Sequence, residues 1–378
     1  MKALYLRRLG RSPQQGPGNP NQLFFQALTG MLAVALALSG CRPEPGTPTS
    51  TPLIAGTGAA ASDSSGLATP TAGPFQIELP AQHSEPVIDW RPPLYPVPWA
   101  VGPFDHFYFA RPIAADEINW PLASYRYGGV FFEDVVHTGV DIDAPFGTSI
   151  LAAGPGTVVW ADWGLFLETP GAIEDPYGMA VVLRMDFGRM GKPLYSVYAH
   201  MSEIIAIKGQ HVETGEILGR VGDTGATTGP HVHFEVRWGS NSFHHTYNPE
   251  LWMAPPEGWG VLVARLVDRR GTPIYLLDIN LEHTASGESR LARTYGPGAV
   301  NSDPYYRENL VSGDLPAGIY KLTFIWEKVE HQEWLTIRPG QVTYFAYRDG
   351  EGFRLSPPPA PAIDGLPTAE SAPAATPP

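Results

Sequence analysis

The chain has 378 residues, of which 43% are hydrophobic, and a formal net charge of −13. This length allows two or more domains, and the hydrophobic content is sufficient to fill their cores. An acidic chain without a basic stripe cannot neutralise a phosphate backbone, which argues against nucleic acid as a partner. Cys41 is the single cysteine, so neither an internal disulfide nor a thiolate zinc cluster can form.

The first segment of the chain, residues 1–41, is predicted to be a signal peptide. Basic Arg7, Arg8 and Arg11 precede an apolar stretch from about residue 23 to 38, and small residues lie just before Cys41. This pattern resembles a bacterial lipoprotein signal, in which cleavage leaves the cysteine thiol for lipid attachment. A plain signal peptide or a membrane helix is the alternative, but the apolar stretch is short for a span of about 20 residues. We therefore predict lipidation at Cys41 and an extracytoplasmic, membrane-anchored location in the cell envelope.

Composition divides the remainder of the chain. Residues 42–75 are rich in Pro, Thr, Ser and Gly and are predicted to form a disordered tether, because they cannot bury enough apolar surface to fold. Residues 76–119 combine aromatic side chains with prolines and are interpreted as an ordered lead-in to the next domain. The Pro/Ala-rich residues 356–378 are predicted to be a disordered tail.

Two folded domains are predicted between these segments. Residues 120–255 contain short β-rich stretches separated by glycine-containing turns, and no long stretch has the 3.6-residue period of an amphipathic helix, so this domain is expected to be all-β. Residues 260–350 carry further strand candidates and are expected to form a small β-sandwich. Within them, residues 314–322 (Asp-Leu-Pro-Ala-Gly-Ile-Tyr-Lys-Leu) resemble the closing strands of carboxypeptidase-regulatory or transthyretin-like domains.

The most informative motif is the pair His231 and His233. The surrounding residues are β-branched and aromatic, which favours a strand. Side chains two residues apart on a strand point to the same side, so the two imidazoles stand together as a zinc site requires. Most His-x-His pairs are ordinary histidines, but here His137-Thr-Gly-Val-Asp141 and Tyr-Ala-His200 accompany the pair.

His137 and Asp141 can converge on one metal only if the chain bends between them. On a straight strand they would be about 13 Å apart at ~3.3 Å per residue, whereas zinc ligands lie at about 2.0–2.2 Å from the ion. Gly139 lies between them and tolerates unusual backbone angles. A catalytic zinc typically has three protein ligands and lowers the pKa of its bound water to about 7. Histidines beside such a site, as expected for His200 and His231, can accept the water proton or donate to an oxyanion.

Together these motifs resemble the lysostaphin-type zinc metallopeptidases, whose fold is the duplicated hybrid motif. The resemblance rests on His137-Thr-Gly-Val-Asp141, on Tyr-Ala-His200-Met, and on residues 222–235 (Gly-Asp-Thr-Gly-Ala-Thr-Thr-Gly-Pro-His-Val-His-Phe-Glu). It covers about residues 120–250, little more than a third of the chain, and all its parts occur in order.

The resemblance implies an activity and a role for each site residue. His137, Asp141 and His233 would bind one Zn²⁺, and His200 and His231 would be the catalytic pair around the zinc-bound water. The implied substrate is the peptide part of bacterial peptidoglycan, and the implied reaction is endopeptidase cleavage.

Two segments of this domain depart from the compact form of the family, and one acidic residue has more than one possible role. Residues 165–176 and 188–193 form longer segments than the compact domain requires and are predicted to be loops beside the groove. Glu235 shares the strand face of His231 and His233, which fits a supporting or substrate-binding role.

Two functions other than an enzyme are alternatives for a domain of this fold. A non-catalytic domain of the same fold, which binds the wall and activates another hydrolase, typically lacks one or more ligands, whereas all five positions are intact here. A biotinyl- or lipoyl-type carrier needs a lysine at a hairpin tip, usually after Met, and no Met-Lys pair occurs within residues 120–350. The C-terminal unit could bind wall glycan or a protein partner, or shield the groove, and the sequence leaves these alternatives open.

Overall fold

The computed structural model describes residues 95–100, 104–113, 123–132, 135–298 and 300–358. The predicted signal peptide with Cys41, the tether and the tail beyond residue 358 lie outside the described residues. Within the described ranges the chain forms 19 strands and three 3-10 helices of three residues each, and no helix is long and apolar enough to cross a membrane. The all-β fold class is confirmed. The 3-10 helices are η1 (Ala123–Tyr125), η2 (Phe243–His245) and η3 (Pro249–Leu251).

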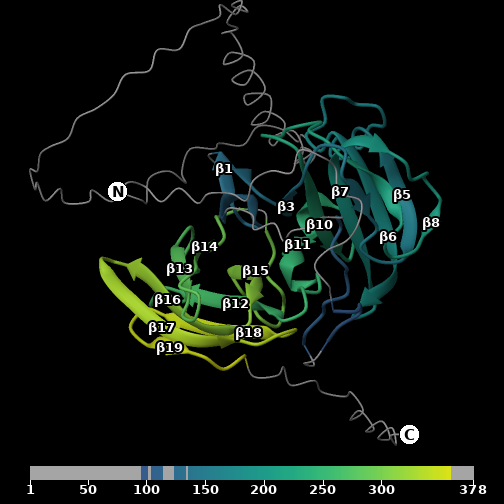
Figure 1. The fold of residues 1–378 in the computed structure, drawn as a ribbon. Helices are drawn as coiled ribbons and strands as arrows, with labels where there is room; N and C mark the ends of the chain where they lie inside the picture. Colours follow the sequence, from purple (N-terminus) through teal and green to yellow (C-terminus); the bar gives the residue numbers. More distant parts are fainter. Residues whose placement is uncertain (1–94, 101–103, 114–122, 133–134, 299, 359–378) are drawn as a thin grey trace, which may run out of the picture. The chain divides into compact units, whose positions relative to one another are not determined.

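The largest element is a nine-stranded antiparallel sheet (Figure 1). Its main path runs in the order β11-β10-β7-β6-β5-β8, while β3 also pairs with β10, and β9 pairs with both β4 and β7. The strands are β3 (Val140–Asp143), β4 (Ser149–Leu151), β5 (Gly156–Asp162), β6 (Met179–Arg189), β7 (Lys192–Ile204), β8 (His211–Val212), β9 (Ile217–Val221), β10 (His231–Trp238) and β11 (Thr246–Tyr247).

Strand β10 pairs with three other strands of this sheet, and all eight of its residues are buried. Its β-branched and aromatic side chains suit a strand that is covered on both faces. Along one edge its first half pairs with β3, with His233 opposite Asp141, and its second half pairs with β11. Along the other edge it pairs with β7, with His233 opposite Ala199. This register places His233 of β10 between Asp141 of β3 and the part of β7 that carries His200.

A two-stranded sheet, β1 (Val130–Phe132) with β2 (Val135–Val136), precedes β3. His137 follows β2 directly, so this small sheet sets where the first predicted ligand enters the site. The lead-in also contacts the large sheet. Phe107 and Phe109 are fully buried, and the Leu151 N–H of β4 donates to the Pro112 carbonyl at 2.9 Å.

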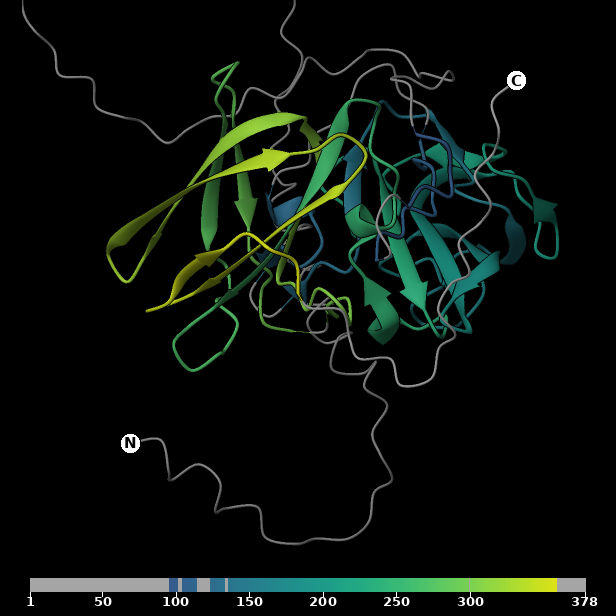
Figure 2. The same ribbon diagram turned by 90° about the horizontal axis from the view of Figure 1, so that it is seen from below.

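The C-terminal residues form two four-stranded sheets, drawn in green to yellow in Figures 1 and 2. Their orders are β15-β12-β18-β19 and β14-β13-β16-β17, and only the β12–β18 pair is parallel. The strands are β12 (Trp259–Val267), β13 (Asp278–His283), β14 (Ser289–Arg293), β15 (Leu310–Pro316), β16 (Gly318–Trp326), β17 (Val329–Ile337), β18 (Val342–Arg348) and β19 (Gly352–Arg354).

Two apolar clusters stabilise this arrangement. One contains Leu262, Leu281 and Phe345 from both C-terminal sheets, so these two sheets share a core. The other joins the nine-stranded sheet to C-terminal residues such as Val261 and Tyr295. The second cluster makes the C-terminal sheets part of the packing around the large sheet. Membership of the C-terminal sheets in the carboxypeptidase-regulatory or transthyretin-like class stays a prediction.

Candidate metal centre

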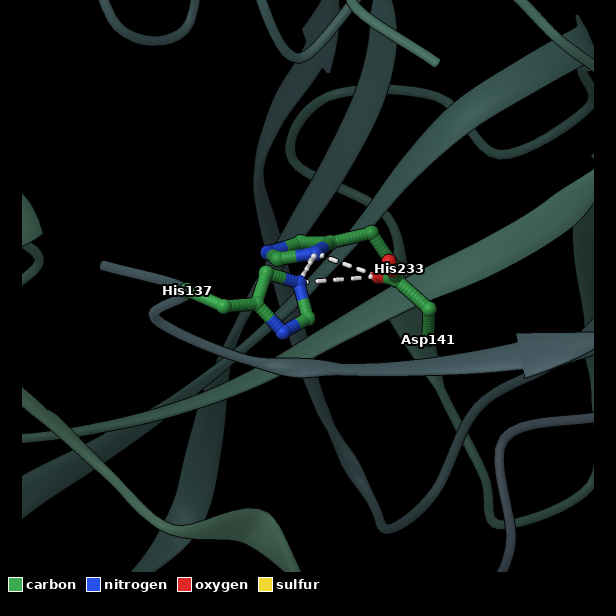
Figure 3. A group of neighbouring side chains, drawn as sticks. All are labelled: His137, Asp141 and His233. Carbon is green, nitrogen blue, oxygen red and sulfur yellow. Dashed lines mark hydrogen bonds and ion pairs between the residues drawn. The ribbon is translucent and has the colours of Figure 1, made fainter. Parts of the chain in front are cut away.

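His137, Asp141 and His233 converge on one point (Figure 3). His137 Nε2 lies 2.9 Å from His233 Nδ1 and 3.0 Å from Asp141 Oδ1, and His233 Nδ1 lies 2.9 Å from the same oxygen. Tetrahedral bonds of about 2.0 Å would place ligand atoms roughly 3.3 Å apart, so this triangle is within a few tenths of an ångström of a zinc-binding arrangement. Two imidazole nitrogens and a carboxylate oxygen are also ligand types that zinc accepts.

The bend that joins His137 to Asp141 is found at Gly139, but its reason differs from the expected one. Gly139 does not have a positive φ. Instead, a Cβ atom there would come within 2.5 Å of the Phe234 carbonyl oxygen and 2.7 Å of the His233 ring. A residue with a side chain would not fit here, because the chain just before β3 passes close to strand β10.

Each of the two predicted histidine ligands is oriented by a second hydrogen bond. His137 Nδ1 lies 3.1 Å from the Arg126 carbonyl oxygen, which leaves Nε2 to face the triangle. His233 presents Nδ1 to the triangle, and its Nε2 lies 3.1 Å from Glu235 Oε1. Outer partners of this kind fix the tautomer and ring orientation of histidines that bind metals. The donor set therefore fits a zinc ion in chemistry and in orientation.

Glu235 is the centre of a buried polar network behind His233. Its Oε1 accepts hydrogen bonds from Thr138 Oγ1 at 2.7 Å and from the Tyr177 hydroxyl at 2.6 Å. Its Oε2 accepts from Arg237 Nε at 2.7 Å, and Arg237 also donates to the Tyr177 hydroxyl at 2.9 Å. The carboxylate is fully buried, so these partners replace the water that burial removes.

The electrostatics of the site keep its carboxylates charged. Burial alone would raise the pKa of Asp141, but charge and hydrogen bonds from His137 and His233 outweigh it and hold the pKa well below its usual value. Burial likewise would raise the pKa of Glu235, and Arg237 and His233 lower it to about 2. Burial would lower the pKa of His233, but its hydrogen bonds to Asp141 and Glu235 raise it to about 9. A metal ion at His233 must therefore displace a proton.

His200 and His231 stand beside the triangle. Their rings are 4.8 Å apart between centroids, and His231 Nε2 lies 3.6 Å from Asp141 Oδ1. His200 Nδ1 and His231 Nδ1 each lie 2.8 Å from a backbone carbonyl oxygen, of Thr224 and Gly229 respectively. Each Nδ1–H donates to that carbonyl, so in the neutral imidazole the lone pair lies on Nε2. Burial, followed by the charges of His231 and His233, lowers the pKa of His200 well below its usual value.

Comparison with known proteins identifies the domain that carries this site. Residues 135–245 match the model of peptidase family M23. The chain carries an M23 peptidase domain. The resemblance inferred from the motifs is thereby confirmed for this part of the chain.

Curated relatives of the M23 domain are bacterial proteins. The chain is 34% identical over 127 residues to the DD-carboxypeptidase/endopeptidase Mpg of Neisseria meningitidis, an alignment that covers 34% of this chain and 26% of that protein. It is 35% identical over 101 residues to the peptidoglycan DD-endopeptidase ShyA of Vibrio cholerae, covering 26% and 20%. It is 30% identical over 118 residues to a lipoprotein NlpD/LppB homolog of Pseudomonas aeruginosa, covering 31% and 35%. The match to Mpg thus spans about a quarter of that relative.

Among solved structures, the catalytic domain of lysostaphin from Staphylococcus simulans matches at 26% identity. The alignment covers 35% of this chain and 89% of that chain, with a TM-score of 0.29.

The two segments predicted to border the groove of the M23 domain have different outcomes. Residues 165–176 end just before Tyr177, whose hydroxyl contacts Glu235, and their position beside a groove stays a prediction. Residues 188–193 instead form the hairpin turn between β6 and β7, eight residues along β7 from His200. At about 3.3 Å per residue the hairpin lies roughly 26 Å from the site, so the expectation for this segment is wrong.

Tyr177 and Arg237 are the residues of this site that the motifs did not indicate. Arg237 lies two residues after Glu235 on one strand, so the two-residue period could have placed it on the same face. Tyr177 enters from a loop 58 residues earlier in the chain and has no local sequence signal.

We expect Glu235→Gln to weaken zinc binding by about 10- to 100-fold, because it weakens the hydrogen bond that orients His233 through Nε2. The same change removes the buried partner of Arg237 and should destabilise the fold by about 3–5 kcal/mol. Chelator competition and thermal unfolding measure the two effects. Thr138→Val, which removes one bond to the same carboxylate, is the milder control, and unchanged zinc affinity in Glu235→Gln would contradict this role.

Proposed function

We propose that the protein is a zinc-dependent endopeptidase that hydrolyses peptide cross-links or stem peptides of bacterial peptidoglycan. The observation that carries the proposal is the convergence of His137, Asp141 and His233 within an M23 domain, with two further histidines beside it. The names of the relatives, a DD-carboxypeptidase/endopeptidase and a DD-endopeptidase, support the same substrate class.

In this proposal His137, Asp141 and His233 hold one Zn²⁺. Bound zinc would supply a Lewis acid for the scissile carbonyl and for the attacking water. His200 and His231 would do the proton chemistry at their Nε2 atoms, one accepting a proton from the water and the other donating to the developing oxyanion or the leaving amine. Their Nδ1–H bonds to backbone carbonyls support this division, because they hold both rings with Nε2 available.

The alternative is a non-catalytic M23 domain that binds the wall and activates another hydrolase. All three predicted ligands and both predicted catalytic histidines are present and buried around one point, which favours the enzyme.

We also propose an extracytoplasmic location with a lipid anchor at Cys41. The arginines, the apolar stretch and the small residues before Cys41 support this, as does the similarity to a protein named as a lipoprotein NlpD/LppB homolog. The proposed tether, residues 42–75, would let the domain reach wall polymer from the membrane. The role of the C-terminal sheets toward wall glycan or a protein partner stays open.

The proposal predicts chelator-sensitive cleavage of the cell wall polymer. The purified protein is incubated with purified peptidoglycan, with and without a zinc chelator, and released fragments are identified by mass. Release that stops with chelator and returns with added Zn²⁺ is expected, and the fragment masses identify the bond. Release that persists in chelator would exclude the metal mechanism. A protein that binds zinc and wall but releases nothing would favour the non-catalytic alternative.

A further inference from the structure

Residues 126–129, which we call the bridge segment, hold His137 along its backbone and its ring. The Gly128 N–H donates to the His137 carbonyl at 2.8 Å, and the His137 N–H donates to the Gly129 carbonyl at 2.8 Å. His137 Nδ1 lies 3.1 Å from the Arg126 carbonyl oxygen. Both backbone polar groups of His137 and one ring nitrogen are therefore bonded to the bridge segment.

The other side of the bridge segment contacts Tyr295, Gly296 and Asn301 of the C-terminal part. The Gly296 N–H donates to the Gly128 carbonyl at 2.7 Å. The ring of Tyr127 meets that of Tyr295 edge to face, with centroids 5.3 Å apart. The Tyr127 hydroxyl accepts a hydrogen bond from the Asn301 N–H at 2.7 Å. Both tyrosines are buried, so this seam excludes water from its polar groups.

A buried ion pair ties the start of the bridge segment to the C-terminal sheets. The Arg126 guanidinium contacts the Glu250 carboxylate, and these side chains are 4% and 6% exposed. Glu250 Oε1 also accepts a hydrogen bond from the Gly313 N–H of β15 at 2.9 Å. Because the loss of one partner of a buried pair is costly, this contact resists displacement of the segment.

We infer that the C-terminal sheets position His137 as a metal ligand, acting through the bridge segment. The inference rests on the proposed function. A ligand whose ring and backbone are held in advance binds metal with less loss of conformational freedom, and the outer partners of ligands typically change metal affinity 10- to 100-fold. Neither the bridge segment nor residues 295–301 belong to the matched range 135–245, so this support lies outside the part of the chain that the family model covers.

The test is Tyr295→Leu in the full chain. The Tyr295 ring lies against Gly128, where an added Cβ would come within 2.5 Å of it, so its loss leaves a gap under the bridge segment. We expect zinc affinity, measured by chelator competition, to fall about tenfold, and the visible spectrum of bound Co²⁺ to change. Tyr295→Phe keeps the ring and loses a hydroxyl that bonds Asn248 and Glu308, so it should restore both readouts.

Tyr320→Leu is the matched control. Tyr320 is a buried tyrosine of β16 in the core shared by the two C-terminal sheets, where its ring packs near His283. Both leucine variants should lower the melting temperature, but only Tyr295→Leu should change zinc affinity and the Co²⁺ spectrum. Wild-type affinity and spectrum in Tyr295→Leu, or an equal loss in Tyr320→Leu, would overturn the inference. If Tyr295→Leu does not fold, Tyr127→Phe tests the same seam by deleting only a hydroxyl, and a severalfold loss of affinity is expected.

Failure of this inference can be told from failure of the proposed function. A wild-type chain that binds no Zn²⁺ would overturn both. A wild-type chain that binds Zn²⁺, with His137→Ala weakened and Tyr295→Leu unchanged, would overturn only the positioning role of the C-terminal sheets.

Discussion

His233→Ala is expected to abolish zinc binding and, with it, cleavage of peptidoglycan. His233 touches both other predicted ligands, at 2.9 Å from His137 Nε2 and 2.9 Å from Asp141 Oδ1, and it is also bonded to Glu235. Its loss leaves two ligands, whereas a catalytic zinc typically takes three. It also leaves Asp141 and Glu235 without the imidazole between them, two buried carboxylates facing a gap. Metal content of the purified variant and fragment release from peptidoglycan measure the outcome.

His211→Ala is the control for this experiment. His211 is also paired with an acidic residue, Asp186 at 2.7 Å, but its side chain is about half exposed and it lies on β8, outside the site. This variant should retain zinc and activity. Stoichiometric zinc in purified His233→Ala would show that the ligand assignment is wrong.

His231→Ala should separate metal binding from turnover. His231 lies 3.6 Å from Asp141 Oδ1, farther than the three atoms of the triangle lie from one another, and we assign it to proton transfer and not to the metal. The variant is therefore expected to keep its zinc. Loss of a positioned acid or base typically costs about 10²- to 10⁴-fold in rate, and we expect turnover to fall within that range.

Zinc content, melting temperature and rate should be measured on the same preparation of His231→Ala. Retained metal and fold with lost turnover support the assigned role. A zinc-free variant would make His231 a ligand, and a variant with wild-type turnover would remove it from the chemistry. His200→Ala provides a parallel case, because its Nε2 is held free in the same way by a bond from Nδ1 to the Thr224 carbonyl.

The parts of the site that lie on one strand could be predicted from sequence. The two-residue period places His231 and His233 on one face, and the structure has both near Asp141. The need for a bend at Gly139 also followed from distance alone, since four residues of straight strand are too long. The reason for glycine did not follow, because the lack of space comes from β10, which is remote in sequence.

The supports of the site could not be predicted in the same way. Tyr177 reaches Glu235 from 58 residues away, and Asn301 reaches Tyr127 from 174 residues away. Such contacts follow from tertiary packing, and neither spacing nor residue type signals them in a single sequence. The prediction for residues 188–193 was wrong for a related reason: length indicated a loop, but only strand pairing decides to which end of the sheet it belongs.

The distance along the chain between the bridge segment and Asn301 has a consequence for when the site can form. During synthesis, residues emerge from the N-terminus onward at about 5–20 per second. Tyr127 and Asn301 are 174 positions apart, so the partner of the bridge segment is made roughly 10–35 s after it. The seam around His137 can therefore form only late in synthesis. A nascent chain that already carries all five predicted site residues, four histidines and one aspartate, still lacks the groups that hold His137 in place.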